Sequence, residues 1–261
     1  MEALVVSGCA LLGLLFGSFA NVVIHRVPAG ESVSHPRSAC PGCGTPIAPR
    51  DNIPVLSWLL LRAKCRHCGQ PISARYPLVE AGMAGIFALV GWRVGLDWSL
   101  PGFLLFAWTL VVVAVIDAET RKIPNRLTYP LTPALLVLLV AAAVLAGNSG
   151  QAVTAVIGGV AGFVGLLVLA LIQPRGMGMG DVKLAGFIGI GLGYLSLGHV
   201  LLGLFGGFLL GGVVAILVLA TGRRGRRDQI PFCPYLAAGG IVALLVGEPL
   251  IRAYLRATGL A

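Results

Sequence analysis

Long apolar stretches recur along this chain, each close to the length that crosses a lipid bilayer. A transmembrane helix needs about 20 apolar residues, because the hydrocarbon layer is about 30 Å thick. Lipid offers the backbone no hydrogen bonds, so continuous stretches of this length are expected to be helices. The stretches are residues 2–24, 77–95, 99–117, 130–147, 152–172, 182–198, 199–220 and 231–250. The sequence therefore predicts an all-α polytopic membrane protein with about eight transmembrane helices.

Charged residues are scarce, which excludes an ordinary soluble domain. Only 11% of the 261 residues are charged, whereas soluble proteins have about 25%. If the N-terminus lies outside, all of the 19 lysines and arginines except Arg93, Arg252 and Arg256 fall on the cytosolic side. This asymmetry follows the positive-inside rule and supports that orientation. Because topology accounts for most of the net charge of +9, we expect no nucleic-acid partner.

The long polar segment, residues 26–76, carries two CxxC knuckles. Cys40 and Cys43 form the first, and Cys65 and Cys68 form the second after 21 intervening residues. Four thiolates at such spacing are typical of a zinc ribbon, in which the metal has a structural role. A glycine follows each knuckle and allows the chain to turn around the metal. The predicted orientation places this loop in the reducing cytosol, where stable disulfides are rare.

Other roles for the cysteines are open. One CxxC could be a thiol–disulfide redox pair, although such a pair needs no second knuckle nearby. A catalytic zinc is disfavoured, because four cysteine ligands leave no open position for water. We expect Cys9 and Cys233, which lie in apolar stretches, to be small packing residues.

Between the knuckles, residues 52–62 are apolar but too few to cross a membrane. We expect a short helix or hairpin on the membrane surface, with Trp58 at the level of the lipid headgroups. The neighbouring Asp51 is expected to be exposed to solvent.

Two aspartates lie at the ends of apolar stretches, where carboxylates are costly. Asp117 ends the stretch 99–117, and Asp181 follows the glycine-rich residues 176–180 and precedes the stretch 182–198. Acids near membrane depth are candidates for functional sites. Counting the spans places both aspartates at the cytosolic face. Two carboxylates that share one proton can activate a water molecule for attack on an amide, as in aspartic proteases.

Two other interpretations of the aspartates remain. In the structural one, Asp117 caps its helix or pairs with Arg121 or Lys122, and Asp181 pairs with Lys183. In a transporter, both acids would bind a proton or cation. Both aspartates lie at one membrane face, and Asp181 lies beside a glycine-rich segment. This position favours catalysis over the structural and the transporter interpretations. We expect Glu80, the third acid near a membrane face, to be a packing or boundary residue.

The chain resembles the bacterial bifunctional prepilin peptidases, the type IV leader peptidase/N-methyltransferases. The resemblance extends from the first apolar stretch to the last. It rests on both knuckles and on residues 16–28, 57–59, 75–80, 117–127, 176–184 (which contain the motif GMGMGD) and 230–232.

The resemblance implies a catalytic pair, Asp117 and Asp181. Such enzymes cut the leader of type IV prepilins or type II secretion pseudopilins after a glycine, at the cytosolic face of the inner membrane. They then methylate the new N-terminus with S-adenosylmethionine, and the cysteine loop accompanies the methylating members. Residues 26–76 contain no glycine-rich nucleotide loop, so the residues that bind the methyl donor cannot be named.

The resemblance also suggests a division of the chain, and it has two departures. We expect a first transmembrane helix (1–25), a methyltransferase-associated zinc loop with four cysteine ligands (26–76) and a seven-helix peptidase core (77–261). Ala20 stands where the family usually has leucine, and Cys233 replaces the glycine of an IPFGP motif.

Overall fold

The computed structural model describes residues 1–173, 177–221 and 231–259. The described residues are helical apart from turns, loops and two isolated β-bridges. The chain divides into two compact units, Met1–Leu96 and Asp97–Ala261. The predicted all-α membrane architecture is confirmed, with the cysteine loop between the first two long helices.

The first unit is built on a pair of long helices, α1 (Glu2–Ala29) and α3 (Arg75–Val94). Glycines let their backbones approach closely: a Cβ atom built on Gly13 would lie 2.6 Å from the Cα of Ala84, and one on Gly17 would lie 2.7 Å from the Cα of Glu80. Small residues commonly serve this purpose between membrane helices. The connecting loop contains a 3-10 helix (Pro49–Asp51) and the short helix α2 (Leu56–Leu60).

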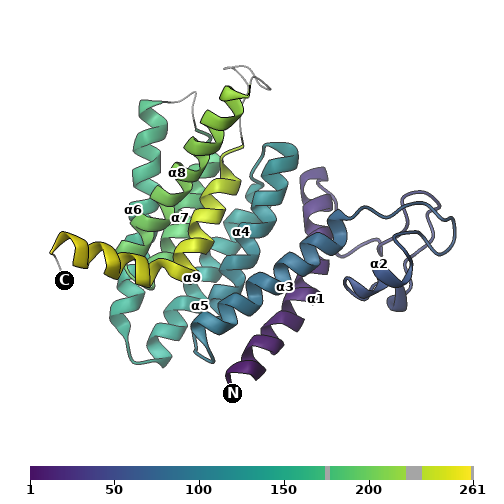
Figure 1. The fold of residues 1–261 in the computed structure, drawn as a ribbon, viewed down its shortest axis with the longest axis horizontal. Coiled ribbons are helices and arrows are strands. Elements are labelled where there is room, and N and C mark those ends of the chain that lie inside the picture. The colour runs from purple at the N-terminus through teal and green to yellow at the C-terminus, as the bar shows by residue number, and fades with distance from the viewer. Residues whose placement is uncertain (174–176, 222–230, 260–261) are drawn as a thin grey trace. The chain divides into compact units, whose positions relative to one another are not determined.

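In its described residues, the second unit is a bundle of six helices (Figure 1). Their bounds are α4 (Leu100–Thr120), α5 (Asn125–Leu145), α6 (Ser149–Ile172), α7 (Met179–Gly193), α8 (Leu197–Ala220) and α9 (Cys233–Thr258). Helix α7 packs against each of the other five. All of its residues from Leu184 to Gly193 are buried. This short helix is therefore the centre of the unit.

Seven helices of the described chain are long and apolar enough to cross a membrane, rather than about eight. The difference is α7, which has only 15 residues because it ends at Gly193 before the turn into α8. Several other helix ends also differ from prediction, among them the end of α1, which continues past residue 24 to Ala29. Helix α4 continues past Asp117 to Thr120, α5 begins at Asn125 rather than at residue 130, and α9 continues past residue 250 to Thr258.

Some residues used in the predictions lie outside the described ranges. They are Arg175 and Gly176 of the glycine-rich segment, the basic residues Arg223, Arg224, Arg226 and Arg227, and Ile230.

The contact between α6 and α7 depends on glycines of both helices. A Cβ on Gly158 of α6 would collide with the carbonyl oxygen of Gly189, and one on Gly193 of α7 would lie 2.6 Å from the carbonyl oxygen of Thr154. Neither helix can therefore carry a side chain at these positions without moving apart from the other. By contrast, nothing lies within 4 Å of a Cβ on Gly165, which is also in α6.

Two alanine substitutions in α6 should therefore change stability in opposite directions. Gly158→Ala forces α6 and α7 apart, and overpacking of this kind costs about 1–3 kcal/mol. Gly165→Ala adds no contact and should stabilise the helix by about 0.5–1 kcal/mol. Thermal unfolding of the detergent-solubilised protein, followed by circular dichroism, measures both. Equal shifts of the unfolding temperature in the two variants would show that the backbones of α6 and α7 do not approach closely at Gly158.

Candidate active site and metal centre

Asp117 lies in the last full turn of α4 and is buried, with 6% of its surface exposed. The helix ends just beyond it, because Arg121 adopts a left-handed conformation (φ 56°) and its N–H donates to the Asp117 carbonyl at 2.8 Å. The side-chain carboxylate accepts a hydrogen bond from the backbone N–H of Cys233, at the start of α9. Its Oδ2 atom is buried and has no hydrogen-bond partner among the described residues.

Asp181 lies in the first turn of α7 and is half-buried. Its Oδ2 accepts a hydrogen bond from the backbone N–H of Gly178 at 3.2 Å. This bond satisfies one of the N–H groups that a helix leaves free at its start, and the positive end of the helix dipole favours a carboxylate there. The aspartate therefore caps the helix that it opens.

The fold brings the two aspartates together, although 63 residues separate them in sequence. The start of α7 lies against the turn that follows α4, where a Cβ on Gly180 would be 2.9 Å from the Cβ of Ile123. The two carboxylates are close enough for Asp117 to repel the negative charge of Asp181. The close approach needs glycine at position 180, which agrees with the glycine-rich sequence before Asp181.

The ion pairs of the structural interpretation do not fit this geometry. Within the described residues, neither aspartate forms an ion pair with a lysine or arginine. Lys183 instead donates to the Asn125 side-chain oxygen at 2.9 Å and to the Tyr129 hydroxyl at 3.0 Å. A buried carboxylate oxygen without a partner is unusual, because such a group loses its hydration without compensation.

Sequence reasoning underestimated Cys233. Its thiol is buried, as predicted for a packing residue, but it lies within the electrostatic field of both aspartates, and its backbone binds Asp117. The departure from an IPFGP motif was the one sequence signal that pointed to this position. Glu80 also does more than pack: its Oε2 accepts a hydrogen bond from the Val55 N–H at 2.7 Å, within the first unit.

The four cysteines of the knuckles form one cluster. The Sγ atoms of Cys40, Cys43, Cys65 and Cys68 all lie within 4.8 Å of one another, and those of Cys40 and Cys68 are 3.7 Å apart. Zn–S bonds of about 2.3 Å in a tetrahedron separate the sulfurs by about 3.8 Å, whereas a disulfide bond is only about 2.05 Å long. The donor set and spacing therefore fit a four-coordinate metal ion.

The two knuckles have the same backbone structure. In the first, the N–H of Cys40 donates to the Thr45 carbonyl and that of Gly44 donates to the Cys40 carbonyl. The second repeats these bonds from Cys65 to Gln70 and from Gly69 to Cys65. Gly44 and Gly69 have φ of 69° and 72°, a left-handed conformation that glycine adopts without strain. The predicted role of the two glycines in turning the chain is confirmed.

Polar contacts hold the rest of the loop to the knuckles. Asp51, expected to be exposed to solvent, is instead bound by Arg66, whose guanidinium holds the pKa of this carboxyl below its usual range. The indole N–H of Trp58 donates to the Ile72 carbonyl at 3.0 Å. The Cys43 sulfur lies 3.3 Å from the Thr45 hydroxyl oxygen, and hydrogen bonds with the side chain and the backbone of Thr45 lower the pKa of the Cys43 thiol to about 6.

Two family models match the chain. The bacterial peptidase A24 N-terminal domain matches residues 11–94, and the type IV leader peptidase family matches residues 104–216. The chain belongs to the type IV leader peptidase family. No solved structure matches this chain.

Relatives named prepilin leader peptidase/N-methyltransferase match nearly the whole chain. The one from Bacillus subtilis is 37% identical and is aligned over 94% of this chain and 96% of its own length. The one from Aeromonas hydrophila is 38% identical (94% and 92%), and the one from Pseudomonas aeruginosa is 35% identical (95% and 93%). The predicted membership of this family is confirmed.

Removing one knuckle cysteine should release the metal. A serine at Cys40 leaves three thiolates, and the full-length protein with Cys40→Ser should lose most of the one bound metal ion expected per chain. Elemental analysis of the purified protein measures both the identity and the amount of the metal. Cys9→Ala is the control, because Cys9 is buried against Gly91 and far from the knuckles in sequence. Equal metal content in the two variants would contradict the four-thiolate site.

Proposed function

We propose that this protein cleaves the leader peptide of type IV prepilins or type II secretion pseudopilins and then methylates the new N-terminus. The observation that carries the proposal is the position of two partly or fully buried aspartates, at the end of α4 and the start of α7, close enough for their charges to repel and without an ion-pair partner among the described residues. The family membership and the names of the relatives support the same activity.

Asp117 and Asp181 are the proposed catalytic residues. Two neighbouring carboxylates share a proton, because both cannot be charged at low cost. The ionised one takes a proton from a water molecule, whose oxygen attacks the carbonyl carbon of the scissile bond. The protonated one donates to the carbonyl oxygen, and collapse of the tetrahedral intermediate breaks the C–N bond and passes a proton to the leaving amine. Asp117 Oδ2 has no hydrogen-bond partner among the described residues and is therefore available for these proton transfers.

The surroundings of the aspartates suit this chemistry. The backbone N–H groups of Cys233 and Gly178 each bind one carboxylate and keep it in place. Asp117 is buried and Asp181 is half-buried, so electrostatic interactions between them are stronger than in bulk water. The bond that is cut is expected to follow a glycine, whose lack of a side chain lets the substrate backbone enter between α4 and α7.

The cysteine cluster is proposed to hold a structural zinc ion that folds the loop. Its ligands would be Cys40, Cys43, Cys65 and Cys68, which leave no open coordination position. S-adenosylmethionine, when bound, would supply the methyl group for the new N-terminal amine.

The proposed location is the bacterial cytoplasmic (inner) membrane, with the N-terminus outside and the aspartates at the cytosolic face. The uneven distribution of basic residues supports this orientation. Lys122 and Lys183 lie near the aspartates in sequence and belong to this basic side.

Replacing either aspartate by asparagine should abolish cleavage. General acid–base catalysis contributes about 10²–10⁴-fold, so we expect Asp117→Asn and Asp181→Asn to lose at least two orders of magnitude in rate. Glu119→Gln is the matched control: it removes an exposed carboxylate two residues from Asp117 and should keep its activity. The assay incubates purified protein with a prepilin and S-adenosylmethionine and reads intact mass.

The mass readout separates the possible outcomes. Loss of the leader plus gain of a methyl group by the wild type supports both activities, and leader loss alone supports a peptidase only. Cleavage by either asparagine variant would overturn the catalytic assignment. If the wild type changes no prepilin, a proton- or cation-coupled transporter becomes the better explanation of the two acids.

Disrupting the cysteine cluster should impair methylation more than cleavage. The proposed zinc site and the aspartates belong to different parts of the sequence, 26–76 and 117–181, so Cys65→Ser should leave the peptidase site intact. We expect cleaved but unmethylated product from Cys65→Ser and unchanged products from Cys9→Ala, measured by intact mass. Full methylation by a metal-free Cys65→Ser protein would show that the cluster serves neither activity.

A further inference from the structure

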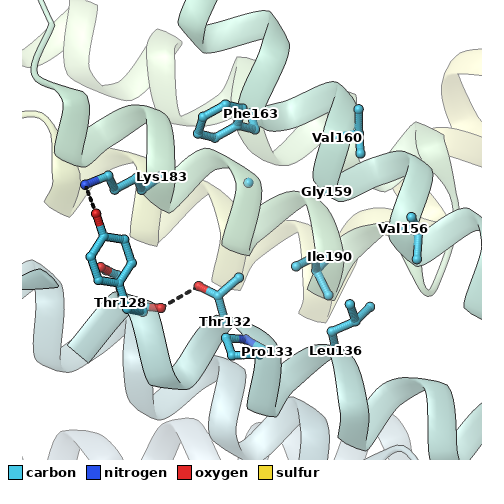
Figure 2. Close-up of a pocket in the computed structure, with 12 residues that line it drawn as sticks. Thr128, Thr132, Pro133, Leu136, Val156, Gly159, Val160, Phe163, Lys183 and Ile190 are labelled. Atoms are coloured by element: carbon cyan, nitrogen blue, oxygen red, sulfur yellow. Dashed lines mark hydrogen bonds between the residues drawn. The ribbon is translucent and has the colours of Figure 1, made fainter. Parts of the chain in front are cut away.

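Besides the two aspartates, the second unit contains a cavity of about 470 Å³ between α5, α6 and α7. Figure 2 shows its lining, with Lys183 at one end and Leu136 and Val156 at the other. Apart from Lys183, Tyr129 and two threonines, the lining residues are apolar or glycine. The cavity therefore combines a long apolar wall with one cationic end.

The cavity opens to the surroundings of the bundle. Tyr129, Val156 and Val160, which line it, have 61%, 45% and 58% of their surfaces exposed. Helices α5 and α6 are among the seven that are long and apolar enough to cross a membrane. A cavity open at this level faces lipid rather than water.

Lys183 brings an uncompensated positive charge to the cavity. Its ammonium group donates to Asn125 Oδ1 at 2.9 Å and Tyr129 OH at 3.0 Å, and it lies 4.7 Å from the centre of the Tyr129 ring. All of these partners are electrically neutral. No described carboxylate pairs with this lysine. An anionic group at this end would therefore gain a charge-assisted hydrogen bond.

We propose that the cavity binds one anionic phospholipid of the membrane, with its phosphate at Lys183 and an acyl chain between α5, α6 and α7. The phosphate complements the charge of the lysine, and the chain covers the apolar wall. Lys183 is the fifth residue of α7 and Asn125 begins α5, so the headgroup lies at the same end of the bundle as the aspartates. The proposal does not depend on peptidase activity.

The helix of a protein substrate fits this cavity less well. Lys183, Gly186 and Ile190 lie on one face of α7, whereas Asp181 is turned from Lys183 by about 200° around the helix. A substrate in the cavity would thus lie on the side of α7 away from the aspartate. One turn of a helix about 10 Å wide and 5.4 Å long occupies about 420 Å³, so the cavity holds little more than one turn. A flexible acyl chain needs less width.

The first test is native mass spectrometry of the full-length protein, titrated with phosphatidylglycerol after removal of endogenous lipid. The wild type should bind one phosphatidylglycerol about fivefold more tightly than phosphatidylcholine with the same chains, because one lysine near a membrane contributes about that factor towards anionic lipid. Lys183→Gln should abolish this preference. Lys122→Gln, which removes an equal charge from the exposed turn after α4, should keep it.

A second pair of variants tests the acyl chain. Val160→Trp fills the cavity and should weaken the binding of both lipids about tenfold, since excluding even two methylene groups has this effect. Val168→Trp adds the same bulk to an exposed position of α6 that does not line the cavity and should bind as the wild type does. Equal affinities for wild type, Lys183→Gln and Val160→Trp would overturn the proposal.

A photocrosslinker at position 160 distinguishes the lipid from a protein occupant. In membranes that contain the Asp181→Asn protein and a prepilin, the proposal predicts crosslinks to phospholipid. Crosslinks to the prepilin instead would assign the cavity to the substrate and overturn the lipid site. Both results are read as mass adducts on the intact protein.

Discussion

The second unit depends on how closely backbones approach the short helix α7. Gly158 of α6 meets Gly189 of α7, Gly180 lies against Ile123, and Gly191 lies against the ring of Phe106. In a membrane, where apolar side chains gain little by leaving lipid, such close packing is a main source of helix association. The contacts place the start of α7, with its aspartate, beside the end of α4. Both the proposed active site and the lipid cavity follow from this arrangement.

The two faces of α7 have different environments and different proposed roles. One face carries Asp181, which lies close enough to Asp117 for the two negative charges to repel. The other carries Lys183, held by Asn125 and Tyr129 of α5 beside an open apolar cavity. A bound lipid would therefore contact the helix that positions an aspartate without blocking access to the pair. It would also fill a gap between helices that are otherwise packed tightly.

The cysteine loop is stabilised in a different way from the helices. A largely polar segment of about 50 residues is too short to bury a sufficient apolar core. Two equivalent knuckles bring four sulfurs together, Arg66 binds Asp51, and Trp58 binds the Ile72 carbonyl. A metal ion at the knuckles would provide the folding energy that hydrophobic burial cannot. The loop can thus be stable beside a membrane without a large core.

The sequence by itself determined the features that depend on local composition: the apolar helices, the four-cysteine site, and the candidate aspartates. Bilayer thickness and ligand spacing leave few alternatives for such patterns. Only the tertiary structure decided the length of α7, the contact of Cys233 with Asp117, the binding of Asp51 by Arg66, and the neutral partners of Lys183. Each of these depends on which residues meet across the fold, and the sequence around a single residue does not contain that information.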